Sequence, residues 1–316
     1  MMDTKKALSY GIFLLILAIL PFGLNSNWVS VMTTFLIYST VALSQDIVLG
    51  RAGMFDMGHA IFFGLGAYAT AILNMQFGWP ILATIPIAII LPTIASVLLA
   101  APIIHLRGDY LLVTTIGFNI VFIQALKNNV FGITGGPNGI FGVEPLKILG
   151  FTFTSQNSIY FLALFILILT LIIIHNLETS KPGRALHYLN LDSLASECIG
   201  INTKFYRLYA FALSAAIAGL AGVVFTLQFS AVSPDAFDFL QSVLFFTIVL
   251  VGGPSSIPGV LLGTFFMFVV PEIFRQFAEA RYLVFGVAMI LIMIFRPKGI
   301  WPVKFGRIPN FLTKEQ

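Results

Sequence analysis

The chain has 316 residues, of which 58% are hydrophobic and only 9% charged, and its formal net charge is +4. A water-soluble domain carries roughly 25% charged residues, so the composition excludes a soluble fold and indicates an all-α polytopic membrane protein. The single cysteine, Cys198, excludes an intrachain disulfide framework and a thiolate metal cluster.

Long apolar segments follow one another along the whole chain, which we treat as one transmembrane domain, residues 1–316. A helix needs about 20 apolar residues to cross the hydrocarbon core of a bilayer. By this measure the sequence predicts about ten spans. They cover residues 7–24, 29–49, 58–75, 80–104, 110–126, 159–176, 206–228, 239–252, 258–274 and 281–296. Glycines in "GHAIFFGLGAY" and "VGGPSSIPG" predict broken helices near 58–66 and 252–258.

The first span follows Lys5 and Lys6 and has the shape of a signal peptide, but no convincing small-residue cleavage site follows, so we expect it to be retained. Lys and Arg are enriched in cytoplasmic loops. With both termini in the cytoplasm, thirteen basic residues lie inside and four outside, which accounts for all 17. The outer four are Lys127, Lys147, Arg275 and Arg281. The basic charge is therefore explained without nucleic acid.

Ten spans form two halves of five with opposite orientation, which suits the inverted repeat of many transporters. No convincing residue-level repeat relates the halves, so this arrangement is a hypothesis.

The predicted spans carry no charged residue at mid-depth. Asp46, Asp109 and Glu272 lie near span ends, which argues against a proton-driven carrier, because such carriers use intramembrane ionisable groups. The histidines His59, His105 and His175 also fall near span ends without metal-ligand spacing, so we expect interfacial roles and no metal site. The motifs G-x-S-x-G, H-E-x-x-H and G-x-x-x-x-G-K-[ST] are missing from the sequence. We therefore expect no enzyme activity, no cofactor and no ATP site in this chain.

Uncharged polar residues inside the spans offer two interpretations. Thr115, Asn119 and Gln124 on the fifth span form a weakly polar path for a solute, or they make the interhelical hydrogen bonds common in membranes. Small residues spaced four apart predict close helix packing. These are Ala215 with Gly219, Ala218 with Gly222, and Gly259 with Gly263.

The polar inner loop, residues 177–205, contains "DSLASECIG", which has the pattern of a short amphipathic helix that ends at Gly200. Leu194, Cys198 and Ile201 lie at helical spacing, with nothing in their own loop to cover them. This pattern favours a partner at the cytoplasmic face over a plain connector.

Six runs in series resemble the permease subunits of branched-chain amino acid ABC importers, of the LivM type. They are "GRAGMFDMGHAIFFGLGAYATAIL" (50–73), "LRGDYLLVTTIGFNIV" (106–121), "ITGGPNGI" (133–140), "LASECIGINTKFYRLYAFALSAAIAGLAG" (194–222), "VLVGGPSSIPGVLLGTFF" (249–266) and "FRPKGIW" (295–301). Two positions depart from the family pattern, which commonly has Ser at the place of Asp56 and, in ABC importers generally, Glu at the place of Leu194.

The resemblance implies a subunit in a prokaryotic inner or plasma membrane. Its partners would be a second related permease, two cytoplasmic ATPases that hydrolyse the ATP, and an external solute-binding protein. The loop residues Ala195, Glu197, Gly200, Ile201 and Asn202 would dock on the ATPase, and the crowded seventh span would transmit the motion. Leucine, isoleucine and valine are the expected solutes. The alternatives are a urea or short-amide permease of the same kind, more distantly a monosaccharide permease of the same superfamily, and, from another class, an ion-coupled secondary transporter.

Overall fold

The fold is that of a computed structural model, which describes residues 14–106, 108–148, 151–273, 286 and 299–301. After a helical stretch at 14–19 and a 3-10 turn at Leu20–Phe22, the chain is built mainly of α-helices. These are α2 (Ser26–Asp46), α3 (Ala60–Phe77), α4 (Ile81–Ile103), α5 (Asp109–Lys127), α6 (Gln156–Thr179), α7 (Lys181–Leu191), α8 (Ser193–Cys198), α9 (Thr203–Phe229), α10 (Phe239–Gly252), α11 (Ile257–Thr264) and α12 (Val270–Ile273).

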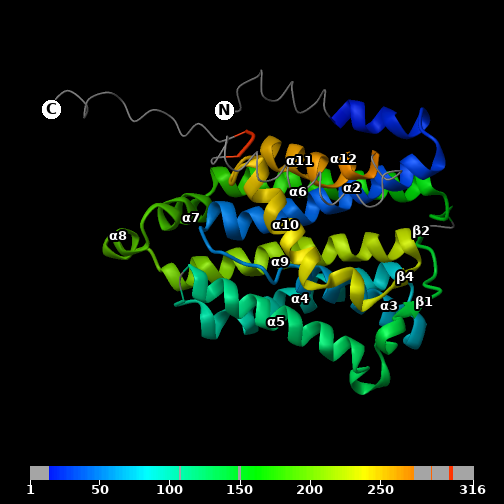
Figure 1. Cartoon of the computed structure of the whole chain (residues 1–316), viewed down its shortest axis with the longest axis horizontal. Helices are drawn as coiled ribbons and strands as arrows, with labels where there is room; N and C mark the ends of the chain where they lie inside the picture. The colour runs from blue at the N-terminus through cyan, green and yellow to red at the C-terminus, as the bar shows by residue number, and fades with distance from the viewer. Residues whose placement is uncertain (1–13, 107, 149–150, 274–285, 287–298, 302–316) are drawn as a thin grey trace.

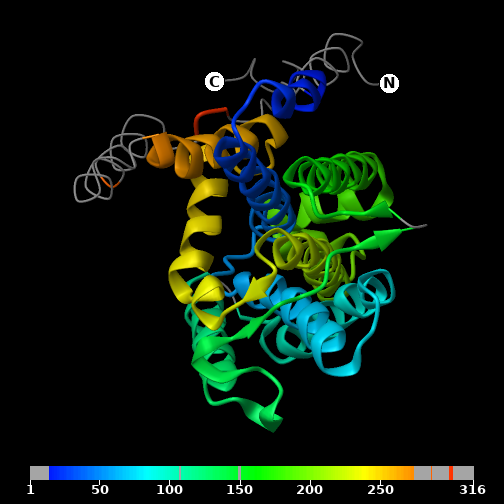
Figure 2. The same cartoon turned by 90° about the vertical axis from the view of Figure 1, so that its right-hand side faces the viewer.

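The long helices lie side by side along one axis of the molecule, and α10 runs across one flank of this bundle (Figures 1 and 2). Helix α9 packs against α2, α3, α4 and α6, and α2 also packs against α6, α10 and α11. Within their most apolar windows, α2 is 83% buried and α9 78%, whereas α4 and α5 are only 28% buried. Helices α2 and α9 therefore form the centre, and α4 and α5 present apolar faces outward.

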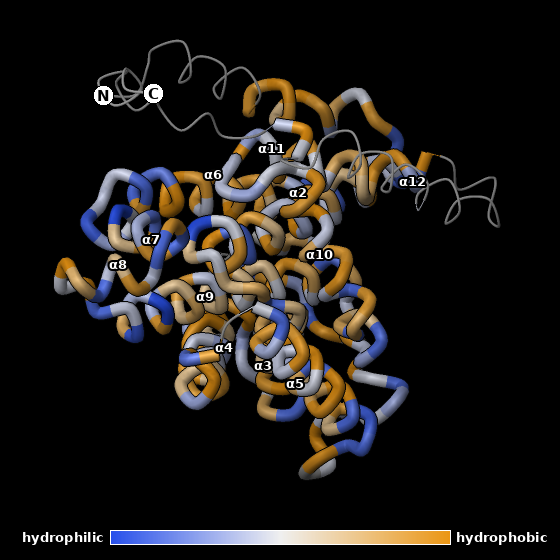
Figure 3. The backbone as a smooth tube through the Cα atoms, turned by 60° about the vertical axis from the view of Figure 1, so that its left-hand side comes forward, coloured by the Kyte–Doolittle hydropathy of each residue, from blue (hydrophilic) through white to orange (hydrophobic). Residues whose placement is uncertain are grey.

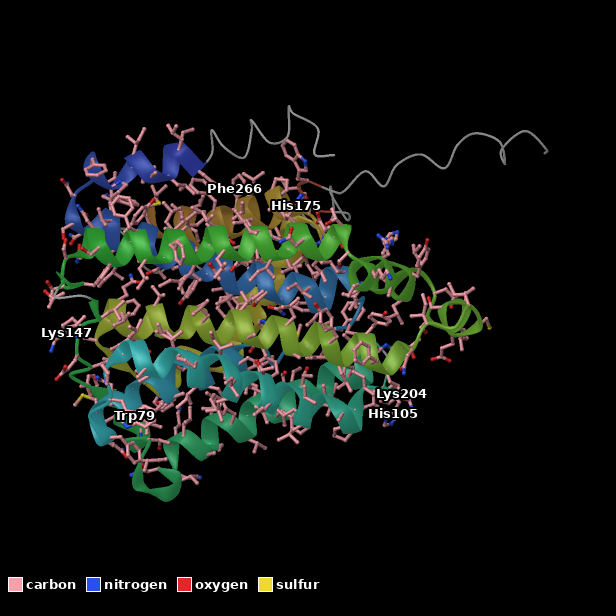
Figure 4. The ribbon with its side chains drawn as sticks, turned by 180° about the vertical axis from the view of Figure 1, so that it is seen from behind. Trp79, His105, Lys147, His175, Lys204 and Phe266 are labelled. Atoms are coloured by element: carbon pink, nitrogen blue, oxygen red, sulfur yellow. The ribbon has the colours of Figure 1, made fainter. Side chains whose placement is uncertain are left out.

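The two ends of the bundle differ in structure. At one end lie α7 and α8, together with His105 and Lys204; at the other lie the short strands, together with Trp79 and Lys147 (Figures 1 and 4). There β1 (Ile140–Phe141) pairs antiparallel with β4 (Ala231–Val232), and β2 (Lys147–Ile148) with β3 (Phe151–Thr152). Gly139 enters β1 with φ +80°, and a Cβ there would lie 2.1 Å from the Val232 carbonyl oxygen. Only glycine fits this approach.

Two joints interrupt the helices near the α7 end. A π-helical turn, Ile47–Arg51, closes α2 and is followed by the non-helical residues 52–59. Between α10 and α11, residues 253–256 leave the helix, with Gly253 at φ +114° and Ser255 at φ +64°. The second joint confirms the predicted break at 252–258. The predicted break at 58–66 is wrong, because α3 is regular from Ala60 and the irregular residues precede it.

Most predicted spans are confirmed. In the described part of the chain, seven helices are long and apolar enough to cross a membrane, and a shorter apolar helix covers Ile257–Ile273. Its middle is a second π-helical turn, Phe265–Val269. Of the predicted span 7–24 only residues 14–24 are described, and of the span 281–296 only residue 286. The total of ten and the five-plus-five inverted arrangement therefore stay predictions.

Candidate functional site

The α7–α8 segment stands out from the bundle as its hydrophilic end, as Figure 3 shows. Three capping side chains define it. The Ser180 Oγ accepts from the Gly183 N–H (3.2 Å) at the start of α7, and the Asp192 Oδ1 accepts from the Leu194 N–H (2.8 Å) and Ala195 N–H (3.1 Å) at the start of α8. The Asn202 Oδ1 accepts from the Phe205 N–H (3.1 Å) and starts α9. These caps satisfy free helix N–H groups, and the inner loop contains the predicted helix α8 and a further helix, α7.

Helix α8 presents its apolar side chains to solvent. Leu194 is 60% exposed and the neighbouring Ile199 67% exposed, and Cys198 and Ala195 are exposed as well. Ile201, predicted to continue the stripe, is half-buried, and Gly200 follows the helix with φ +84°. A surface helix of this kind leaves apolar area uncovered that a partner can bury.

Glu197 has a partner within its own chain. Its Oε1 accepts a hydrogen bond from the Thr203 hydroxyl at 2.7 Å, and the Ile201 N–H donates to the Ser196 carbonyl at 3.0 Å. Helix α8 is thereby tied to the first turn of α9. The predicted docking residues Ala195, Glu197, Gly200, Ile201 and Asn202 thus form one compact corner, in which Glu197 and Asn202 hold the corner together.

Helix α7, which sequence reasoning missed, connects this corner to the bundle. Leu186 and Leu189 are buried, and the Asn190 Nδ2 donates to the Gly50 carbonyl at 2.6 Å. The signal was present in the sequence, because Ser180 followed by Lys181–Pro182 places a capping side chain before a proline in the first helical turn.

An ion triad lies beneath α7. The Arg51 guanidinium contacts the Asp46 carboxylate (Nε–Oδ2, 3.3 Å) and the Glu178 carboxylate (Nη1–Oε1, 2.7 Å). Asp46 is fully buried and Arg51 is 9% exposed. The Ser255 N–H donates to the Asp46 Oδ1 at 2.7 Å, and the Ser255 hydroxyl donates to the Gly50 carbonyl at 2.7 Å. The triad therefore joins the π-helical turn of α2, the end of α6 and the break between α10 and α11.

A second buried network fixes the segment before α3. The Ser44 Oγ lies 2.8 Å from the His59 Nε2, and the His59 Nδ1 lies 3.2 Å from the Asp56 Oδ2. The order Ser–His–Asp resembles the triad of a hydrolase, but all three side chains are at most 1% exposed. A substrate cannot reach the Ser44 hydroxyl, so the network stabilises the fold. His59 is thus buried inside the protein and not interfacial as expected.

The predicted polar residues of α5 divide between two faces. The Thr115 Oγ1 accepts from the Met57 N–H at 3.0 Å, and the Asn119 Nδ2 donates to the Phe237 carbonyl (3.3 Å) and the Ser242 Oγ (3.4 Å). Gln124 is exposed on another side of the helix. The structure therefore places Thr115 against the segment that precedes α3 and Asn119 against the start of α10 and the turn before it, and it leaves Gln124 apart.

The predicted small residues lie where helices approach most closely. A Cβ on Gly219 would lie 2.3 Å from the Ala88 carbonyl oxygen, and one on Gly222 would lie 2.4 Å from that of Phe63. Ala215 and Ala218 are fully buried on the same helix. The same holds between α11 and α10. A Cβ on Gly259 would lie 2.4 Å from the Gly252 carbonyl oxygen, and one on Gly263 would lie 2.4 Å from that of Ile248.

Comparison with known proteins identifies the family of this chain. Residues 27–293 match the family model of the branched-chain amino acid transport system permease component. The chain belongs to this permease family.

Individual relatives agree with the family match. The permease is 34% identical to the high-affinity branched-chain amino acid transport system permease protein LivM of Escherichia coli K12, over 95% of this chain and 76% of the relative. It is 25% identical to the probable LivM of Methanocaldococcus jannaschii (85% and 92% covered) and 25% identical to the LivH permease of E. coli K12 (83% and 90% covered). No solved structure matches the permease. Its similarity to both LivM and LivH is consistent with a permease pair.

Proposed function

We propose that the chain is the LivM-type translocating subunit of an ATP-driven importer for branched-chain amino acids. The family match and the relatives' names support the solute class. The observation that carries the mechanism is the exposure of Leu194 and Cys198 on α8, and of Ile199 directly after it, at a hydrophilic end of the bundle. In this proposal two ATPase subunits cover α8, a second permease completes the pathway, and an external binding protein delivers the solute. The chain itself supplies no hydrolytic chemistry.

The charge distribution supports a cytoplasmic position for the α7–α8 end. Arg51, Lys181, Arg184, Lys204 and Arg207 belong to this end in the described part of the chain, whereas Lys127 and Lys147 belong to the strand end. Basic residues favour the cytoplasmic side. We therefore place the region 177–205 in the cytoplasm as the coupling region, with the strands outside and both termini inside. Of the predicted pathway residues we propose Asn119 alone, because its Oδ1 is buried without a hydrogen-bond partner among the described residues.

Transport assays test the solute and the energy source. Proteoliposomes that hold the chain with its second permease, ATPase subunits and binding protein are expected to take up labelled leucine only with ATP. Urea and ribose serve as competitors. Uptake without ATP would contradict an ATP-driven importer and favour the ion-coupled alternative, and competition by urea alone would assign the chain to the amide branch.

Leu194→Asp tests the docking surface. A charge in the centre of an apolar contact opposes burial, so we expect the ATPase subunits to be lost on co-purification and ATP-dependent uptake to fall by about tenfold or more. Phe141→Asp is the matched control, since Phe141 is 62% exposed at the strand end. Equal ATPase binding by both variants would contradict docking on α8.

Cys198 provides a probe that needs no engineering, because it is the only cysteine and is exposed on α8. We expect a maleimide to label the detergent-solubilised chain rapidly and the complex with its ATPase subunits slowly. A Cys198→Ser, Phe141→Cys variant should label equally in both states. Unchanged labelling of Cys198 in the complex would show that α8 stays uncovered.

A further inference from the structure

The hydrogen bonds around α7 suggest a second route of coupling, besides the contact of α8 with α9. We define the polar joint as Asp46, Arg51, Glu178, Asn190 and Ser255. The Gly50 carbonyl accepts from both Asn190 (2.6 Å) and Ser255 (2.7 Å). A Cβ on Gly50 would lie 2.1 Å from the Asp46 Oδ1 and 2.5 Å from the Ser255 nitrogen. The backbone at Gly50 is therefore held directly between α7 and the break at 253–256.

The polar joint is built to move as a unit. Both Arg51 contacts are charge-assisted, and such hydrogen bonds are stronger than neutral ones; the contact with Glu178, at 2.7 Å, is the shorter of the two. Asp46 and Arg51 are withdrawn from water, where separating one partner leaves an uncompensated charge. A displacement of Asn190 therefore acts on the Gly50 carbonyl, which belongs to the π-helical turn Ile47–Arg51 and also accepts from Ser255.

Helix α7 is flanked by two extended residues and lies beside a cavity. Ser180 and Asp192, the residues that flank it, have extended backbones (ψ 169° and 114°), so its direction is set at two single positions. A cavity of about 330 Å³ lies beside it, lined by Arg51, Glu178, Leu186, His187 and Ser255 among others. Hinges commonly lie at element ends of this kind, and the cavity gives α7 room to shift against the bundle.

The polar joint connects the two places where the helices of the bundle are interrupted. One is the π-helical turn with residues 52–59, and the other is the break with Gly253 and Ser255 at positive φ. We propose that α7, through Asn190, transmits a displacement of α8 to these two joints, while Glu178 at the end of α6 holds Arg51 in place. The displacement would couple ATP hydrolysis to rearrangement of α2, α3, α10 and α11. Asn190 and Glu178 act as positioning residues. This inference rests on the proposed function, since an ATPase must move α8.

The test measures coupling in the complete importer in proteoliposomes, as leucine molecules moved per ATP hydrolysed. Asn190→Ala removes the hydrogen bond to the Gly50 carbonyl, and Glu178→Gln removes the negative charge that pairs with Arg51. We expect each substitution to lower the ratio by about tenfold. ATPase binding and basal hydrolysis should persist, because α8 is unchanged. Asn176→Ala, an exposed position on the last turns of α6, and Glu144→Gln, from the exposed Glu144–Lys147 pair, are the matched controls.

Hydrogen exchange separates transmission from simple weakening. In the wild-type complex we expect ATP to change the exchange of residues 47–58 and 253–256, and in Asn190→Ala these segments should no longer respond while α8 stays protected. Asn190→Asp, which keeps the size but loses the donor, gives the same reading if Asn190→Ala fails to fold. Normal coupling and normal exchange responses in the variants would overturn this inference alone. A wild-type complex without ATP-driven uptake would overturn the proposed function as well.

Discussion

Gly222→Val is expected to destabilise the bundle by about 3 kcal/mol, because added atoms in a close-packed helix contact force backbones apart. A Cβ at this position would lie 2.4 Å from the Phe63 carbonyl oxygen and 2.6 Å from the Ala67 nitrogen. Both contacts are backbone atoms of α3, so no side chain can turn away. The loss is measured as a lower midpoint of thermal aggregation of the detergent-solubilised protein, followed by size-exclusion chromatography.

The control for this substitution lies on α5. A Cβ at Gly117 would meet nothing within 4 Å, and the residue is exposed. Gly117→Val should therefore leave the midpoint nearly unchanged. Equal midpoints for the two valine variants would show that α9 and α3 do not approach as closely as the structure has them.

Arg51→Met is expected to cost about 3–5 kcal/mol, since removing one partner of a buried pair strands the other charge. Asp46 is fully buried, and its remaining hydrogen bond comes from the Ser255 N–H. Lys147→Met breaks an exposed pair, with side chains 58% and 63% exposed, and should cost less than about 1 kcal/mol. The same thermal assay compares the two variants.

A double substitution identifies the cause. Asp46→Asn keeps an acceptor for Ser255 but removes the buried negative charge, so Asp46→Asn combined with Arg51→Met should recover much of the stability lost by Arg51→Met alone. Additive losses in the double variant would contradict a charge origin and point to the packing of the long Arg51 side chain.

The two predictions concern different parts of one mechanism. The glycine contacts make α9, α3 and α4 a tightly packed block, whereas the buried ions fasten the irregular joints near α7 to one another. The proposed coupling needs both, because a displacement that begins at α8 would be lost if it were absorbed in loose packing. In that proposal the packed block of α9, α3 and α4 stays rigid while the polar joint moves.

Composition and periodicity determined the class of this protein. Apolar segments of membrane length predicted the long apolar helices between residues 26 and 273 within a few residues, although not α7, because in a bilayer every backbone group must bond within its own helix. Small residues at spacing four indicated the close contacts of α9 and α11 for a similarly local reason. The pattern of "DSLASECIG" likewise predicted α8, because the apolar spacing and the glycine that ends the helix lie within a few adjacent residues.

Only the tertiary structure showed what the polar residues do. Asp46 and Glu178 are 132 positions apart in sequence, yet both contact Arg51, and no local pattern indicates a pairing of that range. The same holds for Ser44 with His59 and for Asn190 with Gly50. Residue type alone groups Thr115, Asn119 and Gln124, whereas the packing of α5 against α3 and α10 buries Thr115 and Asn119 and leaves Gln124 exposed. Helical periodicity is a local property of the chain, whereas the partner of a buried charge depends on which helices meet, and that is decided by the packing of the whole bundle.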